Sequence, residues 1–313
     1  MIRTLADDKG SFAELSLVET DGGSLVLKRA REKALKPELT AVESAAILFV
    51  TGGIKVVEPD CNELLAHQID TLKAWQKIDG VVKIEPDEGE SSGNGKTQYR
   101  MEYLQGATAR DAFVTGSFSA DMFLELLSIV VAIENSESFN YHGDLKPENI
   151  ICTENGIKLI DPGYFGPLNT LYGREPRVPV TTAIYYPLLK PDDVLALGIL
   201  LWECVLSLHP FMHGSIDDEN YDDRLISKEL LGEVAKKERV GQHIYSAILA
   251  LELPSKLRAD MTEEMEHFLL KTLRLKLNEE GRLAPDRGFS SAAEFRDRFA
   301  ELKASGGLLW RLL

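Results

Sequence analysis

The sequence predicts an α+β fold in which a small, sheet-rich part precedes a larger, mainly helical part. Residues 11–30 alternate apolar and polar side chains, which is typical of two paired strands. Beyond residue 104 the apolar residues recur at helical spacing instead. Residues 194–206 are nearly all apolar over the length of one helix, so we expect this helix to be buried on all sides.

The strand patterns lie early in the chain. Residues 12–18 and 24–28 are two alternating runs, and the Thr-Asp-Gly-Gly sequence at 20–23 between them has the turn chemistry of a hairpin. Apolar runs at 81–84 and 99–103 predict two further strands. Together these runs predict a small antiparallel sheet.

Residues 31–60 interrupt this pattern, and we expect an insert there. The segment begins with charged residues and continues with two short apolar runs around a Thr-Gly-Gly turn, which predict a second hairpin. A helix follows, because Leu64, Ile69 and Trp75 fall on one helical stripe, and Asn62 is its predicted cap. Residues 85–96 are rich in Glu, Gly and Ser and predict a surface loop.

The remaining elements are predicted to be helices. Ser290 or Ser291 before Glu294 has the spacing of a capping box at the start of the last one. The change from strand to helix patterns predicts an N-terminal lobe at 1–104 and a C-terminal lobe at 105–313. The four predicted helices of the second lobe span residues 119–135, 194–206, 263–275 and 291–302.

Composition excludes several classes of partner. A net charge of −15 argues against nucleic acid or an anionic membrane surface as the main partner. No apolar run is long enough to span a membrane, and the first residues lack the apolar region of a signal peptide. The 3 cysteines are not at metal-ligand spacing and predict reduced thiols. We therefore expect a cytoplasmic protein.

The densest chemistry lies at residues 142–150 and at the Asp-Pro-Gly turn that begins at Asp161. Phosphoryl transfer needs a carboxylate to orient the attacking hydroxyl, a lysine to offset phosphate charge, and oxygen ligands for Mg²⁺. Taken singly, aspartate and asparagine are more typical of turn caps, and only the complete string favours catalysis. In chain order, Asp144 supplies the orienting carboxylate, Lys146 the lysine, and Asn149 and Asp161 the oxygen ligands for Mg²⁺.

This string resembles the signature of protein kinases. The kinase catalytic loop reads H-R-D-L-x-x-x-N and the metal-binding turn reads D-F-G, and here Gly143 and Pro162 replace the arginine and the phenylalanine. The chain is similar to bacterial-type Ser/Thr protein kinase domains. The resemblance implies a bilobal kinase-like fold that binds ATP and Mg²⁺ between its lobes. It assigns catalysis to Asp144 and Lys146 and the metal to Asn149 and Asp161.

Upstream residues match the family in the correct order. Gly10 lies where kinases have their glycine-rich loop, and Lys28 resembles the strand lysine that pairs with the α- and β-phosphates. Lys55 is the competing candidate for that lysine. The resemblance also implies a hinge strand that binds the adenine of ATP. The residues that match it are Met101, Glu102 and Tyr103.

Other positions depart from the family or allow two roles. Gln68 falls where a glutamate pairs with the strand lysine; it offers a hydrogen bond to Lys28 but no charge. Glu63 and Asp70 are the alternatives after a register shift. Asp193 is either the buried carboxylate that holds the catalytic-loop backbone or an ordinary helix cap.

The resemblance implies an ATP-dependent Ser/Thr protein kinase that phosphorylates a protein hydroxyl. A pseudokinase that binds nucleotide or a regulatory protein without turnover is the first alternative, favoured by Gln68, Asp8, Pro162 and Leu188. A small-molecule kinase is the second, favoured by the short segment between Gly163 and Asp193. An adenylating enzyme has little support, because the catalytic aspartate is kept.

Overall fold

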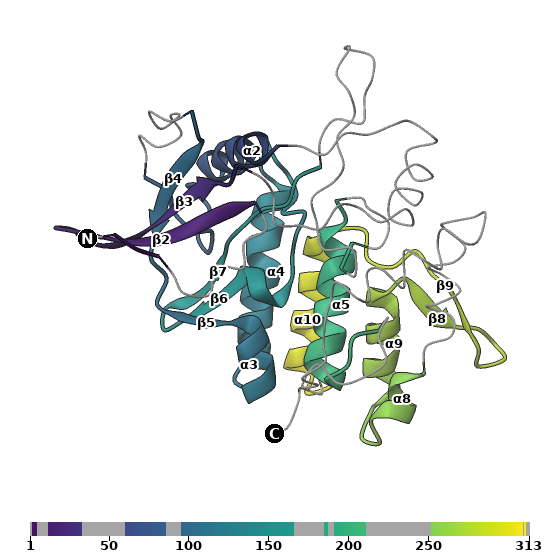
Figure 1. The fold of residues 1–313 in the computed structure, drawn as a ribbon. Helices are drawn as coiled ribbons and strands as arrows, with labels where there is room; N and C mark the ends of the chain where they lie inside the picture. The colour runs from purple at the N-terminus through teal and green to yellow at the C-terminus, as the bar shows by residue number, and fades with distance from the viewer. Residues whose placement is uncertain are drawn as a thin grey trace, which may run out of the picture.

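The computed structural model describes residues 2–4, 12–32, 60–85, 95–165, 185–186, 191–210, 252–308 and 310. Figure 1 shows an α+β arrangement with small antiparallel sheets and several helices. The predicted α+β class is confirmed at this level. Gly10, Lys55 and Leu188 lie outside the described residues, as does most of the predicted insert at 31–60.

The first sheet has the strand order β1-β2-β3-β4, all antiparallel. The predicted hairpin is confirmed, because β2 and β3 pair from Thr20 with Gly23 to Ala13 with Ala30. The predicted strand at 81–84 is wrong, because only its two end residues form bridges, and these are isolated. Val81 bridges to Leu159 and Ile84 to Met101 in β4. The strands of this sheet are β1 (Ile2–Thr4), β2 (Ala13–Thr20), β3 (Gly23–Ala30) and β4 (Gln98–Glu102).

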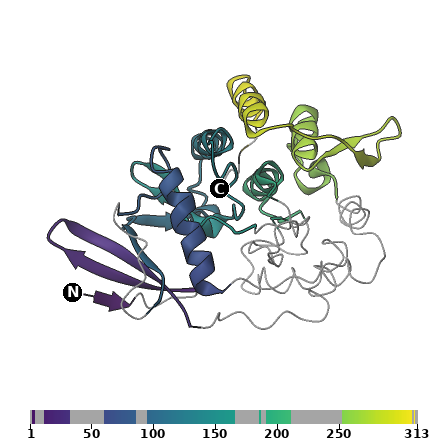
Figure 2. The ribbon, with the colours of Figure 1, turned by 90° about the horizontal axis from the view of Figure 1, so that it is seen from above.

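Helix α2 (Cys61–Ala74) lies beside β3, as Figures 1 and 2 show. Its cap is Asp60 rather than the predicted Asn62, because Asp60 Oδ1 accepts the Glu63 N–H at 2.7 Å. Asn62 instead accepts the backbone N–H of Thr97 at 2.7 Å. This bond ties the helix to the residue before β4 begins. The apolar stripe of α2 is buried as predicted.

A second sheet of three short strands was not predicted from the sequence. It consists of β5 (Gly106–Thr108), β6 (Ile150–Thr153) and β7 (Gly156–Leu159) in that order, antiparallel. Strand β6 begins directly after a 3-10 turn at Pro147–Asn149, and β7 ends just before Asp161. The sheet therefore fixes both chemistry-bearing segments at its ends.

The helices form the main core. Helix α4 (Ala120–Glu134) has Ser119 as N-cap and Asn135 as C-cap, so the prediction for 119–135 is confirmed. Helix α5 (Asp193–Leu206) is buried almost throughout, also as predicted. Helix α10 (Ala292–Ala304) packs on α4, and α9 (Glu263–Thr272) packs on α5 (Figure 2). The shorter helices are α3 (Ala109–Thr115) and α8 (Pro254–Leu257).

The predicted helix at 263–275 ends early. Arg274 has a left-handed φ of 61°, which stops the helix, and Leu275 starts a small strand pair. The pair consists of β8 (Leu275–Leu277) and β9 (Leu283–Pro285). Ser291 is confirmed as the N-cap, since its Oγ accepts the Glu294 N–H at 3.1 Å. The reciprocal bond of the predicted capping box is shifted by one residue, because Glu294 Oε2 accepts the N–H of Ser290 at 2.8 Å.

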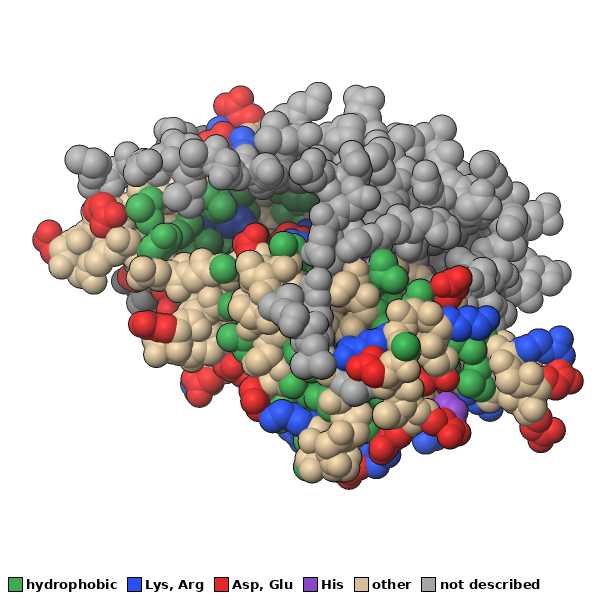
Figure 3. Space-filling model, turned by 90° about the horizontal axis from the view of Figure 1, so that it is seen from below, with side chains coloured by type: hydrophobic (Ala, Val, Ile, Leu, Met, Phe, Trp, Pro, Cys, Tyr) green, Lys and Arg blue, Asp and Glu red, His purple; other side chains and the backbone are tan. Residues whose placement is uncertain are grey.

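The surface of the described residues carries both signs of charge. Figure 3 shows acidic and basic side chains interspersed on the face seen from below. No helix in the described ranges has the length and apolar character needed to cross a bilayer.

Candidate active site

The loop at residues 142–149 closes around Asp144. Asn149 Nδ2 donates to the Asp144 carbonyl at 2.8 Å and to Asp144 Oδ2 at 2.9 Å. Lys146 Nζ lies 3.5 Å from the same Oδ2 atom. The Asn149 amide and the Lys146 ammonium group thus both contact the Asp144 carboxylate and hold it in one orientation.

Lys28 and Asp161 meet although they come from different elements. Lys28 Nζ donates to Asp161 Oδ1 at 2.7 Å, and Lys28 is 6% exposed. Burial lowers the pKa of Lys28, but Asp161 and Tyr99 together raise it above its ordinary value, so the group stays charged. Tyr99 lies opposite Lys28 across the sheet, and burial raises its pKa to about 12. Lys28 is a buried cation aimed at the end of β7.

The turn at residues 161–164 brings Asp161 next to the 142–149 loop. Asp161 has a φ of 54°, in the left-handed region. Its carbonyl lies 3.4 Å from Asn149 Nδ2, and the Gly163 N–H donates to the His142 carbonyl at 2.8 Å. These contacts place Lys28, Asn149 and Asp161 around one point.

Gly163 is required by this close approach. A Cβ atom added there would lie 2.4 Å from the Gly143 carbonyl oxygen, which is backbone and cannot turn aside. We expect Gly163→Ala to lower the free energy of unfolding by about 1–3 kcal/mol through overpacking. Gly22→Ala in the hairpin turn, where the nearest atom is 3.8 Å away, is the control and should change it little. Chemical denaturation measures both variants; equal stability would contradict the close contact.

Asp193 holds the backbone of the loop. Its carboxylate accepts the N–H groups of His142 at 2.5 Å and Gly143 at 3.0 Å, and the Tyr186 hydroxyl at 2.6 Å. The helix cap is the neighbouring Asp192, whose Oδ1 accepts the Leu195 N–H. The loop-holding role is therefore confirmed for Asp193, and the cap role is wrong.

His142 reinforces the same loop in its neutral form. Burial is the main reason that its pKa is lowered. Its Nε2 lies 3.0 Å from the Ile160 carbonyl, so the proton is on Nε2, and Nδ1 accepts the Asp144 N–H at 3.3 Å. The imidazole thus joins the residue before Asp161 to Asp144.

A further polar cluster includes Glu148, the residue before Asn149, and was not predicted. Arg110 Nε donates to Glu148 Oε1 at 2.8 Å, and its Nη2 donates to the Tyr185 hydroxyl at 2.8 Å. Tyr185 in turn donates to Glu203, which is fully buried. No sequence pattern signals this cluster, because its members come from separate segments.

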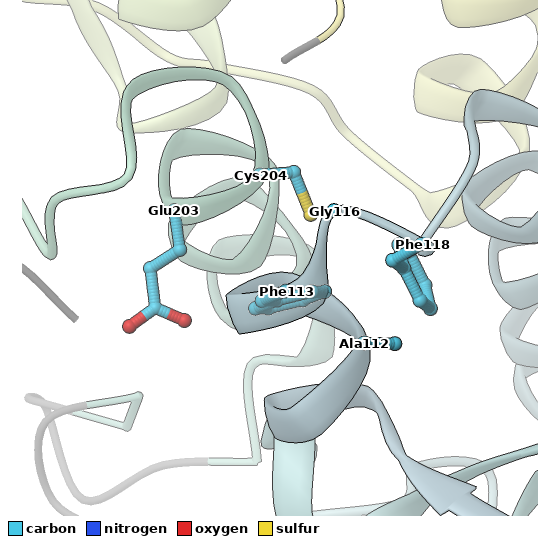
Figure 4. A pocket seen from close by; sticks show the side chains of 6 residues that line it. All are labelled: Ala112, Phe113, Gly116, Phe118, Glu203 and Cys204. Carbon is cyan, nitrogen blue, oxygen red and sulfur yellow. The ribbon is translucent and has the colours of Figure 1, made fainter. Parts of the chain in front are cut away.

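Figure 4 shows the small cavity beside this cluster, between α3 and α5. Its volume of about 10 Å³ is room for one water molecule at most. Cys204 points toward Gly116, whereas the Glu203 carboxylate points away from Phe118 (Figure 4). The cavity is a packing defect and not a ligand site.

Among the residues that the structure describes, helix α2 does not supply a partner for Lys28. Gln68, expected to hydrogen-bond Lys28, instead donates from Nε2 to the Pro162 carbonyl at 3.2 Å. Glu63, the first alternative, accepts the Tyr164 hydroxyl at 2.8 Å, and Asp70, the second, is exposed. The hydrogen bond expected between Gln68 and Lys28 is therefore not the one that forms, and neither Glu63 nor Asp70 takes its place within the described residues.

The predicted adenine-binding residues lie at the end of β4. Met101 is buried, and Tyr103 is 47% exposed. Glu102 is engaged with Lys83: its Oε1 accepts the Lys83 N–H at 2.8 Å, and its own N–H donates to the Lys83 carbonyl. Nucleotide binding by these residues stays a prediction, as it does for Gly10.

The donor set fits Mg²⁺. The side-chain nitrogen of Asn149, Nδ2, donates to Asp144, so the side-chain oxygen of Asn149 is the atom left for a metal. Asp161 uses Oδ1 for Lys28, and its Oδ2 has no partner among the described residues. One carboxylate oxygen and one amide oxygen match the few protein ligands that Mg²⁺ takes beside phosphate oxygens and water.

No protein-family model matches the chain. Myosin light chain kinase family member 4 of Homo sapiens is 24% identical over 229 residues, which cover 69% of this chain and 55% of that protein. Myosin light chain kinase 3 of Danio rerio is 30% identical over 147 residues, 41% of this chain. These matches support a distant relationship to protein kinases.

Each match covers only part of this chain and only part of the related protein. The smooth-muscle myosin light chain kinase of Gallus gallus is 38% identical over 87 residues, 25% of this chain and 4% of that protein. The chain spans about half the length of the human kinase, 55%, and 20% of the zebrafish one. The kinase-like relationship predicted from the sequence is supported, whereas nothing in these matches supports the bacterial-type subgroup.

Proposed function

We propose that the protein is an ATP-dependent Ser/Thr protein kinase, which transfers the γ-phosphoryl group of MgATP to a protein hydroxyl. The observation that carries the proposal is the convergence of two lysine–carboxylate pairs. Lys28 contacts Asp161, Lys146 and Asn149 contact Asp144, and Asn149 lies between the two aspartates. ATP would bind between the parts formed by residues 1–104 and 105–313.

Each polar group then has a task in the transfer. Asp144 orients the substrate hydroxyl and accepts its proton while the new P–O bond forms and the bond to the leaving ADP breaks. Lys146 and Lys28 offset the charge on the phosphate oxygens. Asn149 and Asp161 would hold Mg²⁺, which neutralises phosphate charge when bound. For this, Lys28 has to exchange Asp161 for a phosphate.

The pseudokinase alternative is favoured by one observation. No carboxylate of α2 contacts Lys28 within the described residues, and Lys28 is paired with Asp161 instead. A chain that keeps this pair closed would bind nucleotide poorly or without turnover. Transfer and binding therefore have to be measured separately.

Asp144→Ala is the test. With ATP labelled at the γ-position, Mg²⁺ and a basic acceptor protein, we expect wild type to transfer label and the variant to lose about 10²–10⁴-fold, as general-base removal does. MgATP binding should be retained. Asp121→Ala, which changes an exposed aspartate on α4, is the matched control and should keep full activity.

The outcomes separate the candidate functions. Binding of MgATP by wild type without transfer to protein or to small-molecule hydroxyls would select the pseudokinase. Transfer that is confined to small-molecule hydroxyls would select the small-molecule kinase. Absence of adenine-nucleotide binding by the folded chain would contradict both kinases and would leave only a pseudokinase that binds a regulatory protein.

A further inference from the structure

Helix α2 presents one face to the turn at residues 161–164. Glu63 Oε1 accepts the Tyr164 hydroxyl at 2.8 Å, and Gln68 Nε2 donates to the Pro162 carbonyl at 3.2 Å. Between them, the His67 ring packs edge-on against Tyr164, with 4.9 Å between ring centroids. Residues 63 and 67 are one helical turn apart, and Gln68 follows His67 directly. A single helix therefore holds the turn at both a backbone carbonyl and a side-chain hydroxyl.

The turn needs to be held. Asp161 adopts a left-handed φ of 54°, which is unfavourable for a residue with a Cβ atom. The opposite side of the turn is fixed by the Gly163 N–H, which donates to the His142 carbonyl at 2.8 Å. Pro162 has no N–H of its own, so its carbonyl is its only backbone hydrogen-bonding group, and Gln68 is the donor that reaches it.

The chemistry of this contact selects glutamine over glutamate. A carbonyl oxygen only accepts, so the side chain facing it must supply an N–H or O–H, which an ionised carboxylate cannot do. A carboxylate there would also add negative charge next to the residue that follows Asp161. Charge compensation of Lys28 does not require one, because Asp161 already contacts Lys28 at 2.7 Å.

We infer that Gln68 is a positioning residue, which holds the Pro162 carbonyl and thereby keeps Asp161 in its metal-binding orientation. Gln68 is therefore not a weakened copy of a glutamate that pairs with Lys28. The part that concerns the metal rests on the proposed function, whereas the fixation of the turn does not. The two parts are tested by separate measurements on the same variants.

Two variants and one control isolate the role. Gln68→Glu removes the donor and adds charge, whereas Gln68→Leu removes the donor together with Oε1, which is buried without a partner among the described residues. Gln68→Leu leaves the Pro162 carbonyl without its donor, but the unsatisfied Oε1 leaves as well. Because the two effects oppose each other, we expect the thermal stability of the whole protein to change little. Gln98→Glu makes the same amide-to-carboxylate change on β4, where the side-chain oxygen accepts from Arg29 Nε at 3.0 Å and a carboxylate does so equally well.

The first measurement is hydrogen–deuterium exchange of the peptide that contains the Gly163 N–H, without nucleotide. We expect faster exchange in both Gln68 variants, by about tenfold, as loss of one hydrogen bond of ordinary strength produces. Gln98→Glu should exchange like wild type. Unchanged exchange in Gln68→Leu would overturn the inference, whether or not the protein binds nucleotide.

The second measurement is a Mg²⁺ titration of ATP binding by calorimetry. We expect Gln68→Glu to need about tenfold more Mg²⁺ for half-maximal binding, with Gln98→Glu unchanged. Tighter binding or faster transfer in Gln68→Glu would overturn the inference, since it would show that the carboxylate pairs with Lys28. If wild type binds no ATP while the turn loosens in the variants, the proposed function fails and the positioning role stands.

Discussion

Replacing Asp161 by Asn is expected to abolish phosphoryl transfer while the protein stays folded. The substitution keeps the shape of the side chain but removes the anionic ligand that Mg²⁺ prefers. It also removes the charge that compensates buried Lys28, whose Nζ lies 2.7 Å from Asp161 Oδ1. Loss of electrostatic stabilisation of this kind lowers transfer by about 10³-fold.

Stability should change much less than activity in this variant. The asparagine oxygen still accepts a hydrogen bond from Lys28, and the Asp161 side chain is 33% exposed, so water offsets part of the lost charge. We therefore expect the free energy of unfolding to fall by about 1–3 kcal/mol, less than the loss of a fully buried pair costs. Transfer of γ-label and chemical denaturation measure the two effects, and Asp121→Asn at an exposed position is the control. Wild-type transfer by Asp161→Asn would refute its assignment to the metal.

Replacing Asp193 by Asn is expected to have the largest effect on stability. Its carboxylate accepts the His142 N–H, the Gly143 N–H and the Tyr186 hydroxyl, and Asp193 is 6% exposed. An asparagine has one accepting oxygen, and its NH₂ group would face donors. At least one buried donor is then left unpaired, which costs about 1–3 kcal/mol for each such group and more where the lost acceptor was charged. Phosphoryl transfer should be lost as well, because Asp144 directly follows His142 and Gly143, whose backbone Asp193 holds.

Asp192→Asn is the matched control for this prediction. It lies one residue away on the same helix terminus, and asparagine caps a helix as well as aspartate does. It loses only the ion pair with Arg274, whose Nη2 lies 2.6 Å from Asp192 Oδ2, so we expect a loss of about 1 kcal/mol. Equal stability of the two variants would contradict the loop-holding role of Asp193.

Gln68 shows why site geometry was only partly predictable. The sequence placed a glutamine where a glutamate was expected and indicated Lys28 as the partner of its amide, which is wrong. In the structure the partner is a backbone carbonyl, that of Pro162, which no side-chain pattern encodes. The pairing of Lys28 with Asp161 is of the same kind, because it joins a strand and a turn that are far apart along the chain.

The sequence by itself determined the features that depend on local patterns. The β2–β3 hairpin, the capped helix at 119–135 and the buried helix at 194–206 follow from residue periodicity and turn or cap chemistry over short stretches. The sequence also singled out the chemistry-bearing residues as candidates, because several of them lie within one short string, and their roles stay predictions. Asp193 was placed correctly through its position in the resemblance to kinases.

Only the tertiary structure decided the features that depend on contacts between distant segments. The strands of the second sheet are too short for a periodic signal, and they form because β6 pairs with both β5 and β7. The polar cluster around Arg110 and the left-handed conformation of Asp161 likewise exist because other segments contact them. Local sequence sets backbone preferences, whereas the partner of a buried polar group is set by whichever segments pack around it.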